Sequence, residues 1–329
     1  MTKYTVFLLF LTFIIFPISG CSPLESEPHI VVPPQTEPEA DVHKITEPNN
    51  NEASIPTANP RDIPENDENL AYISAKDFHE KSAEILSTFV NTKGLVDYQE
   101  LRRKRFELNK LLDEFNNLDP NEYKRWSPDD KKAFWINAYN LQKLRVVTDN
   151  YPIESSRILR VLWGPNDIRH IEGEISHYKF LVMDEEFTFK KIEDRFFKKE
   201  FHDPRLFLAL TDACMSSPPL RNEPYYGDKL DVQLNDQARK FLAGQLALKI
   251  DQEKGKVYLS AFFEPGRFGK QFLEKYSINR KFKDFTPEVR AVLNFICKYV
   301  SNQDVIFLEV GNYSIQYMTY DWTINDSSR

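Results

Sequence analysis

Apolar residues recur every three or four positions over five stretches of this chain, and this spacing predicts helices. The stretch after Ser127 carries the clearest start signal. Serine caps a helix, Pro128 suits the first turn, and Asp129 favours the positive end of the helix dipole. The predicted helices cover residues 75–91, 98–117, 127–148, 189–201 and 233–248.

Shorter apolar stretches predict strands over residues 256–260, 304–310 and 314–317, the last two joined at Gly311-Asn312. A short hairpin is expected within residues 168–183, with its turn near Gly173. Helices outnumber strands. We therefore expect an α+β fold, a mostly helical single domain with a small antiparallel sheet.

The chain begins with an apolar run that ends at Ile18-Ser19-Gly20-Cys21. This pattern resembles the bacterial lipoprotein signal, whose cysteine starts the mature protein and carries acyl chains such as palmitate. A transmembrane anchor and a non-lipidated signal are the alternatives, but the run is short for a span. We predict a signal peptide over residues 1–20, lipidation at Cys21 and attachment to a membrane of the bacterial cell envelope. In a Gram-negative host this is the outer membrane, facing the periplasm.

Residues 21–68 are expected to form a disordered acidic tether. From residue 22 to residue 68 there are nine prolines, no glycine, and eleven acidic residues against only Lys44 and Arg61. Such a segment buries too little apolar surface to offset its chain entropy. The remaining residues, 69–329, are nearly neutral overall and show no basic stripe, so we expect one globular domain that does not bind nucleic acid.

Two segments of the globular domain carry polar residues in apolar surroundings. In Phe134-Trp135-Ile136-Asn137-Ala138-Tyr139-Asn140, Asn137 falls on the apolar face of the predicted helix. A buried asparagine needs partners, so it either bonds the backbone of a neighbouring loop or lines a pocket. The second segment runs from Asp203 to Leu220 and is expected to deliver a loop with Asp212, Cys214, Ser216 and Ser217 to an edge.

Together with two further landmarks, these segments resemble the domain-of-unknown-function family 547. The landmarks keep the family's order over roughly residues 95 to 325, and the resemblance implies an exported bacterial protein without a settled activity. Within the second segment the landmarks are Asp203-Pro204-Arg205 with Ala209-Leu210, and Ser216-Ser217-Pro218-Pro219-Leu220. The two further landmarks are Ile192-Glu193 and Tyr320-Asp321-Trp322-Thr323-Ile324-Asn325.

The chain departs from the family pattern at four positions with reactive potential. Asp194 and Phe207 stand where the family has histidines, and Asp212 and Ser217 stand where it has cysteines. Imidazole is the natural general base and thiolate the natural nucleophile or soft ligand. The resemblance therefore implies a degenerate site if the family is enzymatic.

The remaining catalytic candidates are Cys214, His202, Asp212 and Ser217. They are weak, because a nucleophile needs a base within hydrogen-bond reach and the loop itself contains no histidine. His202 is the histidine closest in sequence to the loop, whereas His79 is expected on a solvated helix face. No metal-ligand spacing is present, and no cofactor is expected. A possible ligand-binding pocket comprises Asn137, Asn140, Glu193 and Arg205.

Cys214 and Cys297 are the cysteines left after Cys21. They form one disulfide or remain two free thiols, and the sequence does not distinguish these alternatives because it does not show how far apart the two residues lie. Cys297 lies in an apolar helical pattern and is expected to be a buried, inert thiol.

Two functions follow from these observations. The first is a tethered, non-catalytic binding or scaffold lipoprotein, whose partner is an unknown protein or small molecule. The second is a hydrolase or acyltransferase that uses the loop of Asp212, Cys214 and Ser217. A Cys214 beside His202 favours the enzyme, whereas a Cys214 in the core without a histidine favours binding.

Overall fold

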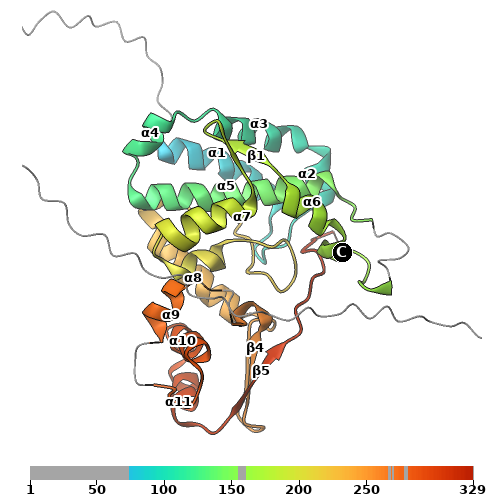
Figure 1. The fold of residues 1–329 in the computed structure, drawn as a ribbon. Helices are drawn as coiled ribbons and strands as arrows, with labels where there is room; N and C mark the ends of the chain where they lie inside the picture. Colours follow the sequence, from blue (N-terminus) through green and yellow to red (C-terminus); the bar gives the residue numbers. More distant parts are fainter. Residues whose placement is uncertain (1–73, 155–160, 266–267, 269, 278–280, 329) are drawn as a thin grey trace, which may run out of the picture. The chain divides into compact units, whose positions relative to one another are not determined.

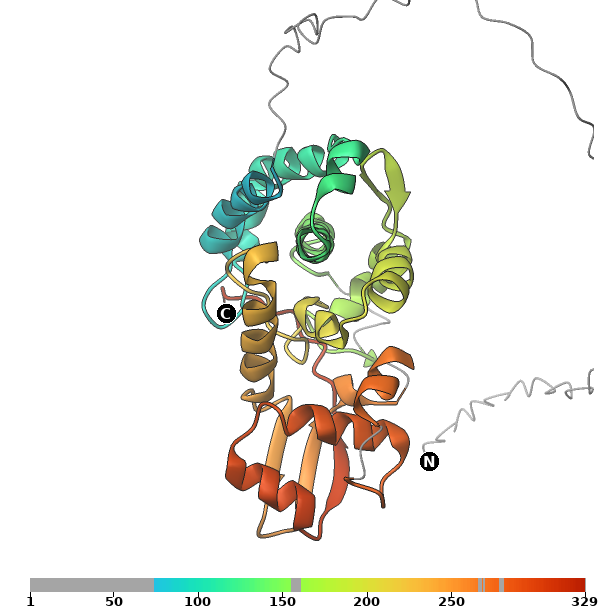
Figure 2. The same cartoon turned by 90° about the vertical axis from the view of Figure 1, so that its left-hand side faces the viewer.

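The central element of the fold is helix α5 (Pro128–Asp149). As predicted, its first turn is capped, and Ser127 Oγ accepts a hydrogen bond from the Asp130 backbone N–H at 3.1 Å. Every residue from 133 to 144 is buried, although the pattern suggested a single apolar face. A helix buried all round lies inside a core, and Figure 2 views α5 nearly along its axis with other helices around it.

The structure, a computed structural model, describes residues 74–154, 161–265, 268, 270–277 and 281–328. These residues belong to one compact unit, Asp67–Arg329. The predicted signal peptide, Cys21 and the tether lie outside the described residues. No helix among the described residues is long and apolar enough to cross a membrane.

Short helices surround α5 (Figures 1 and 2). The predicted helix over residues 98–117 is divided at Lys104, which leaves the helical conformation at φ −106° and ψ 20°. The predicted helix over residues 189–201 is α-helical for only four residues and then continues as a wider π-helical segment, Glu193–Glu200. The surrounding helices are α1 (Ala75–Phe89), α2 (Tyr98–Arg103), α3 (Arg105–Asn116), α4 (Pro120–Arg125), α6 (Glu172–His177) and α7 (Phe189–Ile192).

A two-stranded hairpin, β1 (Phe180–Val182) with β2 (Glu185–Phe187), lies beside these helices. The predicted turn near Gly173 is wrong, because that region forms a 3₁₀ turn (Ile168–Ile171) followed by α6. The hairpin turns instead at Met183 and Asp184, whose φ angles are 51° and 59°. Two successive left-handed residues match the twist of a tight hairpin, even without glycine.

The C-terminal third of the chain forms a three-stranded sheet with helices on one face (Figure 2). Strand β4 pairs antiparallel with β3 and parallel with β5, so the sheet is mixed rather than purely antiparallel. Helix α8 ends at Leu242, earlier than predicted, and residues 248–251 form a strand. The elements are α8 (Leu230–Leu242), β3 (Leu248–Asp251), β4 (Lys256–Ser260), α9 (Lys270–Tyr276), α10 (Pro287–Ile296), α11 (Asn302–Val310) and β5 (Ser314–Met318).

The strand predicted over residues 304–310 is wrong, since this segment is helix α11. Its run of Val305, Ile306, Phe307 and Leu308 fits either structure, because short apolar runs do not separate strand from helix. Ser301 favours the helix, because its Oγ accepts a hydrogen bond from the Asp304 backbone N–H at 3.1 Å and caps the first turn.

Two hydrophobic cores lie in the unit, one around α5 and one between the three-stranded sheet and α8–α10. Helix α8 belongs to both, with Leu230 and Leu234 in the first core and Phe241 and Leu242 in the second. The predicted α+β class, mostly helical with a small sheet, is confirmed.

Candidate functional site

The two polar motif segments meet through Asn140. Its Nδ2 donates to the Ala209 carbonyl oxygen at 2.8 Å, and its Oδ1 accepts from the Thr211 backbone N–H at 3.0 Å. The amide thus pairs with two backbone groups of the segment that leads into the loop. A buried amide satisfied in this way fixes the loop against α5.

Asn137 makes the same kind of contact with a different segment. Its Nδ2 donates to the Tyr225 carbonyl oxygen and its Oδ1 accepts from the Tyr225 backbone N–H, both at 2.9 Å. The interpretation that this asparagine bonds loop backbone is therefore confirmed. The same Nδ2 lies 3.0 Å from Nδ1 of His79.

His79 is completely buried, so the expectation of a solvated position is wrong. Helix α1 presents it to the core, where its ring contacts the rings of Trp126 and Tyr226. Burial lowers the pKa of His79 from 6.5 to about 4, against the opposing charges of Asp130 and Asp228. The histidine is therefore a neutral core residue at physiological pH.

Replacing Asn137 with alanine tests this arrangement. The Asn137→Ala variant is expected to lose about 1–3 kcal/mol of stability, because both backbone groups of Tyr225 stay buried without their partner. Thermal melting measures the loss. The exposed Asn121→Ala variant serves as the control, and equal melting temperatures for the two variants would contradict the structural role of Asn137.

Glu193 and Arg205 have different partners. Glu193 Oε1 accepts a hydrogen bond from the Tyr139 hydroxyl at 2.9 Å. Arg205 binds Asp203 through its guanidinium, with Nη2 2.5 Å from Oδ2, and reaches Asp231 at 2.8 Å. Burial opposes the charged form of Arg205, but the two carboxylates outweigh it and raise its pKa.

The four predicted ligand-binding residues have separate hydrogen-bond and ion-pair partners. Among the described residues, no hydrogen bond or ion pair joins any of them to another. Each is instead engaged with neighbouring backbone or side chains through the contacts given above. A shared pocket of Asn137, Asn140, Glu193 and Arg205 stays a prediction.

The loop of residues 212–217 is held by the C-terminal segment, residues 320–326. Cys214 and Ile324 form an antiparallel bridge, and the Met215 backbone N–H donates to the Thr323 carbonyl oxygen at 2.8 Å. Ser216 Oγ accepts from the Asp321 backbone N–H at 2.8 Å. A segment more than 100 positions away in sequence thus fixes the loop conformation.

Hydrogen bonds also engage the candidate nucleophiles. Ser217 Oγ accepts from the Asp212 backbone N–H at 2.8 Å and donates to the Pro218 carbonyl oxygen at 3.2 Å. Cys214 is 2% exposed, and its Sγ lies 3.7 Å from the Tyr320 hydroxyl. That hydroxyl in turn donates to Asp212 Oδ2 at 3.0 Å.

His202 lies outside the loop of residues 212–217. It is exposed and follows the π-helical segment directly. A base within hydrogen-bond reach is what nucleophilic activation needs. The hydrogen bonds given above pair Ser217 with the backbone of Asp212 and Pro218, and Cys214 with the Tyr320 hydroxyl.

The other two positions at which this chain departs from the family pattern carry structural contacts. Asp194 bonds Lys190 and Lys198 at 2.6 and 2.8 Å, and these bonds lower its pKa to about 2. Phe207 packs edge-on against Phe268, with ring centroids 6.0 Å apart. Neither side chain supplies a proton acceptor to the loop.

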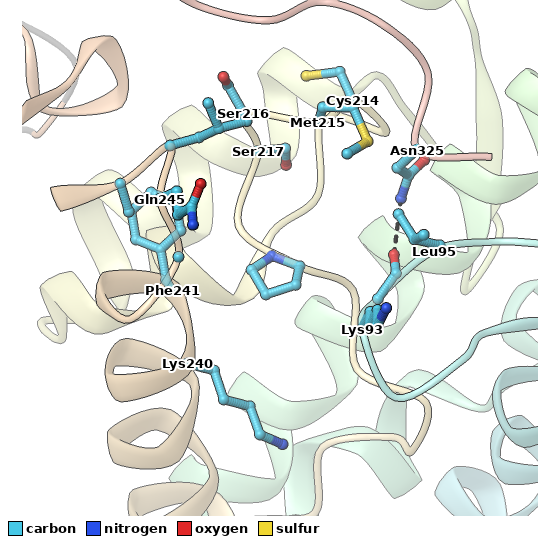
Figure 3. A pocket seen from close by; sticks show the side chains of 15 residues that line it. Lys93, Leu95, Cys214, Met215, Ser216, Ser217, Lys240, Phe241, Gln245 and Asn325 are labelled. Atoms are coloured by element: carbon cyan, nitrogen blue, oxygen red, sulfur yellow. Dashed lines mark hydrogen bonds between the residues drawn. The ribbon is translucent and has the colours of Figure 1, made fainter. Parts of the chain in front are cut away.

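Two cavities lie beside the loop, and they separate the candidate residues. Cys214, Ser216 and Ser217 line a cavity of about 240 Å³ that also touches the end of α8 (Figure 3). Asp212 lines a second cavity of about 260 Å³ with Lys143, Arg169 and Trp322. The hypothetical Asp212–Cys214–Ser217 site is thus divided between two cavities.

Sequence reasoning missed Lys143 and Tyr320. Lys143 is 5% exposed in the middle of α5, with its Nζ 4.2 Å from the Phe189 ring centroid. A lysine inside an otherwise apolar helical stretch is the signal that would have found it. Tyr320 links Cys214 to Asp212 only because the C-terminal segment returns to the loop.

Metal-ligating groups do not cluster in the part of the chain that the structure describes. Cys214 and Cys297 are not joined in a disulfide. Cys297 is half-buried rather than fully buried, and burial raises the pKa of its thiol to about 11. A thiol with so high a pKa is a poor nucleophile near neutral pH.

Comparison with known proteins finds one similarity, over part of this chain. Residues 123–242 match the family model described as "Protein of unknown function, DUF547". The match contains the segments around Asn137 and Ser217, whereas the C-terminal landmark lies outside it. Neither a curated protein nor a solved structure matches the chain. Residues 123–242, which include α5, the loop and α8, are thus similar to the DUF547 family of unknown function.

Proposed function

We propose that this protein is a membrane-tethered lipoprotein whose globular domain binds a partner without catalysis. The observation that carries the proposal is the state of the two candidate nucleophiles. Cys214 is 2% exposed, and the Ser217 hydroxyl is engaged with the backbone of Asp212 and Pro218. Cys214 Sγ lies 3.7 Å from the Tyr320 hydroxyl, so both groups are engaged within the fold.

The four substituted positions support the same function. Where the family has histidine or cysteine, this chain places Asp194 in surface ion pairs, Phe207 in an aromatic contact, and Asp212 and Ser217 in hydrogen bonds of the loop. These four side chains make contacts that support the fold, but they supply neither a histidine base nor a cysteine thiolate. This is what we expect of a domain that no longer catalyses a reaction.

Membrane attachment rests on the N-terminal sequence. The apolar run ending in Ser19-Gly20-Cys21 fits a lipid-modified cysteine, and the acidic, proline-rich residues 21–68 suit a spacer. A binding domain on such a spacer reaches partners away from the bilayer surface. The partner is a protein or a small molecule.

One fractionation experiment tests both parts. Membranes and soluble fractions of bacteria expressing the full chain or its Cys21→Ala variant are treated with iodoacetamide at neutral pH and analysed by intact mass. We expect the parent in the membrane fraction, the variant in the soluble fraction, and no labelling of Cys214 or Cys297 until denaturant is added.

Two outcomes would contradict the proposal. Equal recovery of parent and variant from membranes would contradict the proposal that Cys21 carries a lipid anchor. Rapid labelling of Cys214 that is lost in a His202→Ala variant would show an activated thiolate and favour the hydrolase or acyltransferase. Labelling of Cys214 alone is measured in a Cys297→Ser variant, which serves as the matched control.

A further inference from the structure

The cavity beside Cys214 has a one-sided charge. Its lining contains two lysines, Lys93 and Lys240, and no aspartate or glutamate. Lys93 makes no ion pair with any described residue. Lys240 Nζ lies 3.0 Å from Asp236 Oδ2, and these two side chains are 53% and 41% exposed. Such a surface ion pair is weak, so the cavity carries positive charge that a bound anion would complement.

The polar groups of the cavity wall are already used within the protein. Ser216 Oγ accepts from Asp321, and Ser217 Oγ bonds Asp212 and Pro218. Asn325 donates to the Gly94 carbonyl oxygen at 3.1 Å (Figure 3) and accepts from the Tyr98 hydroxyl at 2.9 Å. A polar ligand would find few partners inside.

The rest of the wall is apolar and reaches the surface. Met215 and Leu246 are 40% and 38% exposed, although both are large hydrophobic side chains, and both line the cavity. Exposed apolar surface next to a hollow is typical of a binding site. The other apolar lining residues are Leu95, Pro219, Phe241 and Ala247.

The wall is also fixed before any ligand arrives. Gly94 adopts φ +79°, and a Cβ there would lie 2.6 Å from Pro219 Cβ, so only glycine allows this close approach. Hydrogen bonds of Asn325 hold the same turn from the other side. A preformed wall reduces the entropy lost on binding.

We propose that this cavity binds a small anionic amphiphile, the carboxylate of a medium-length acyl chain. The chain occupies the apolar wall, and the carboxylate lies at the mouth near Lys93 and Lys240. An apolar cavity of about 150 Å³ holds the six carbons of benzene, so this cavity corresponds to a chain of about ten carbons. The inference deepens the proposed binding function, on which it rests, by naming the class of ligand.

The four methionines of the chain allow a local test, because Met215 lies at the cavity and Met183 and Met318 do not. Methyl spectra of ¹³C-methionine-labelled full chain are recorded with decanoate. The chain carries Cys21→Ala, so that no attached lipid competes, and a Met215→Leu variant assigns the signal. We expect decanoate to shift the Met215 signal saturably and to leave the Met183 and Met318 signals unchanged.

Control ligands and control variants separate the contribution of the acyl chain to binding from that of the carboxylate charge. Acetate and decyltrimethylammonium are expected to leave Met215 unchanged, and decanol to bind at least tenfold more weakly than decanoate. The Lys93→Gln/Lys240→Gln variant is expected to weaken decanoate binding at least tenfold. A Lys249→Gln/Lys254→Gln variant on the β3–β4 hairpin, outside the cavity, is expected to bind like the parent.

An unshifted Met215 signal, equal binding of decanol and decanoate, or equal loss in both lysine variants would overturn the inference. The Met183 and Met318 signals report whether each variant is folded. Failure of decanoate binding while Cys214 stays unlabelled overturns only the ligand class. Decanoate binding together with rapid Cys214 labelling overturns only the non-catalytic function.

Discussion

Lowering the pH from 7 to 4 is expected to remove about 3 kcal/mol of stability through His79 alone. The folded-state pKa of this histidine is about 4, against 6.5 for the exposed group. The difference follows mainly from burial, and a pKa that differs by 1 between the folded and unfolded states corresponds to about 1.4 kcal/mol. His79 is completely buried, so little solvent screening reduces the effect.

The sign follows from which state binds the proton. Below pH 6.5 the unfolded chain protonates His79 while the folded chain does not, so protons favour unfolding. The stabilisation is fully present above pH 6.5 and is lost as the pH falls toward 4. The charges of Asp130 and Asp228 act in the opposite direction and keep the folded-state pKa from falling further.

Urea unfolding of the parent and a His79→Gln variant at pH 7 and pH 4.5 measures this contribution. Glutamine keeps an acceptor for Asn137 Nδ2 and does not titrate, so the difference between the two proteins isolates the histidine. We expect a smaller loss in the variant. A His202→Gln variant, at an exposed position, is expected to lose as much as the parent; equal losses in all three proteins would show that His79 does not titrate as proposed.

Replacing Arg205 with methionine is expected to destabilise the domain by about 3 kcal/mol. Its guanidinium contacts Asp203, and the two side chains are only 14% and 15% exposed. Removing one partner of a buried pair leaves the other charge without compensation. Burial by itself would raise the pKa of Asp203, and Arg205 is what holds that pKa below its usual value.

A double variant separates charge from packing. In Asp203→Asn/Arg205→Met neither charge remains, and we expect it to recover part of the stability lost in Arg205→Met. Lys190→Met, which breaks a surface pair with Asp194, is the control and is expected to change stability little. A loss as small as that of the control would contradict a structural role for Arg205.

Elements were predicted correctly from the sequence where residues close in sequence determine the local conformation. The cap at Ser127 and the start of α5 need only side chains within one helical turn, and the structure has them. Strand β4 has the predicted bounds for a similar reason. The apolar run of residues 304–310 was ambiguous, because neither its period nor its length separates strand from helix.

Burial of His79 was outside the reach of local patterns. A helix face is buried or solvated according to what packs against it, and Trp126 and Tyr226 come from distant parts of the chain. The separation of Asp212 from Cys214 and Ser217 has the same origin. Their spacing in sequence is short, but the returning C-terminal segment places them at two cavities.

The sequence by itself determined that a buried Asn137 needs hydrogen-bond partners and that the fold is mostly helical. Only the tertiary structure decided which groups satisfy the asparagines. Tyr225 lies 88 positions from Asn137, and Ala209 lies 69 positions from Asn140. The physical reason is that a side chain's chemistry states what it requires, whereas long-range packing selects the partner.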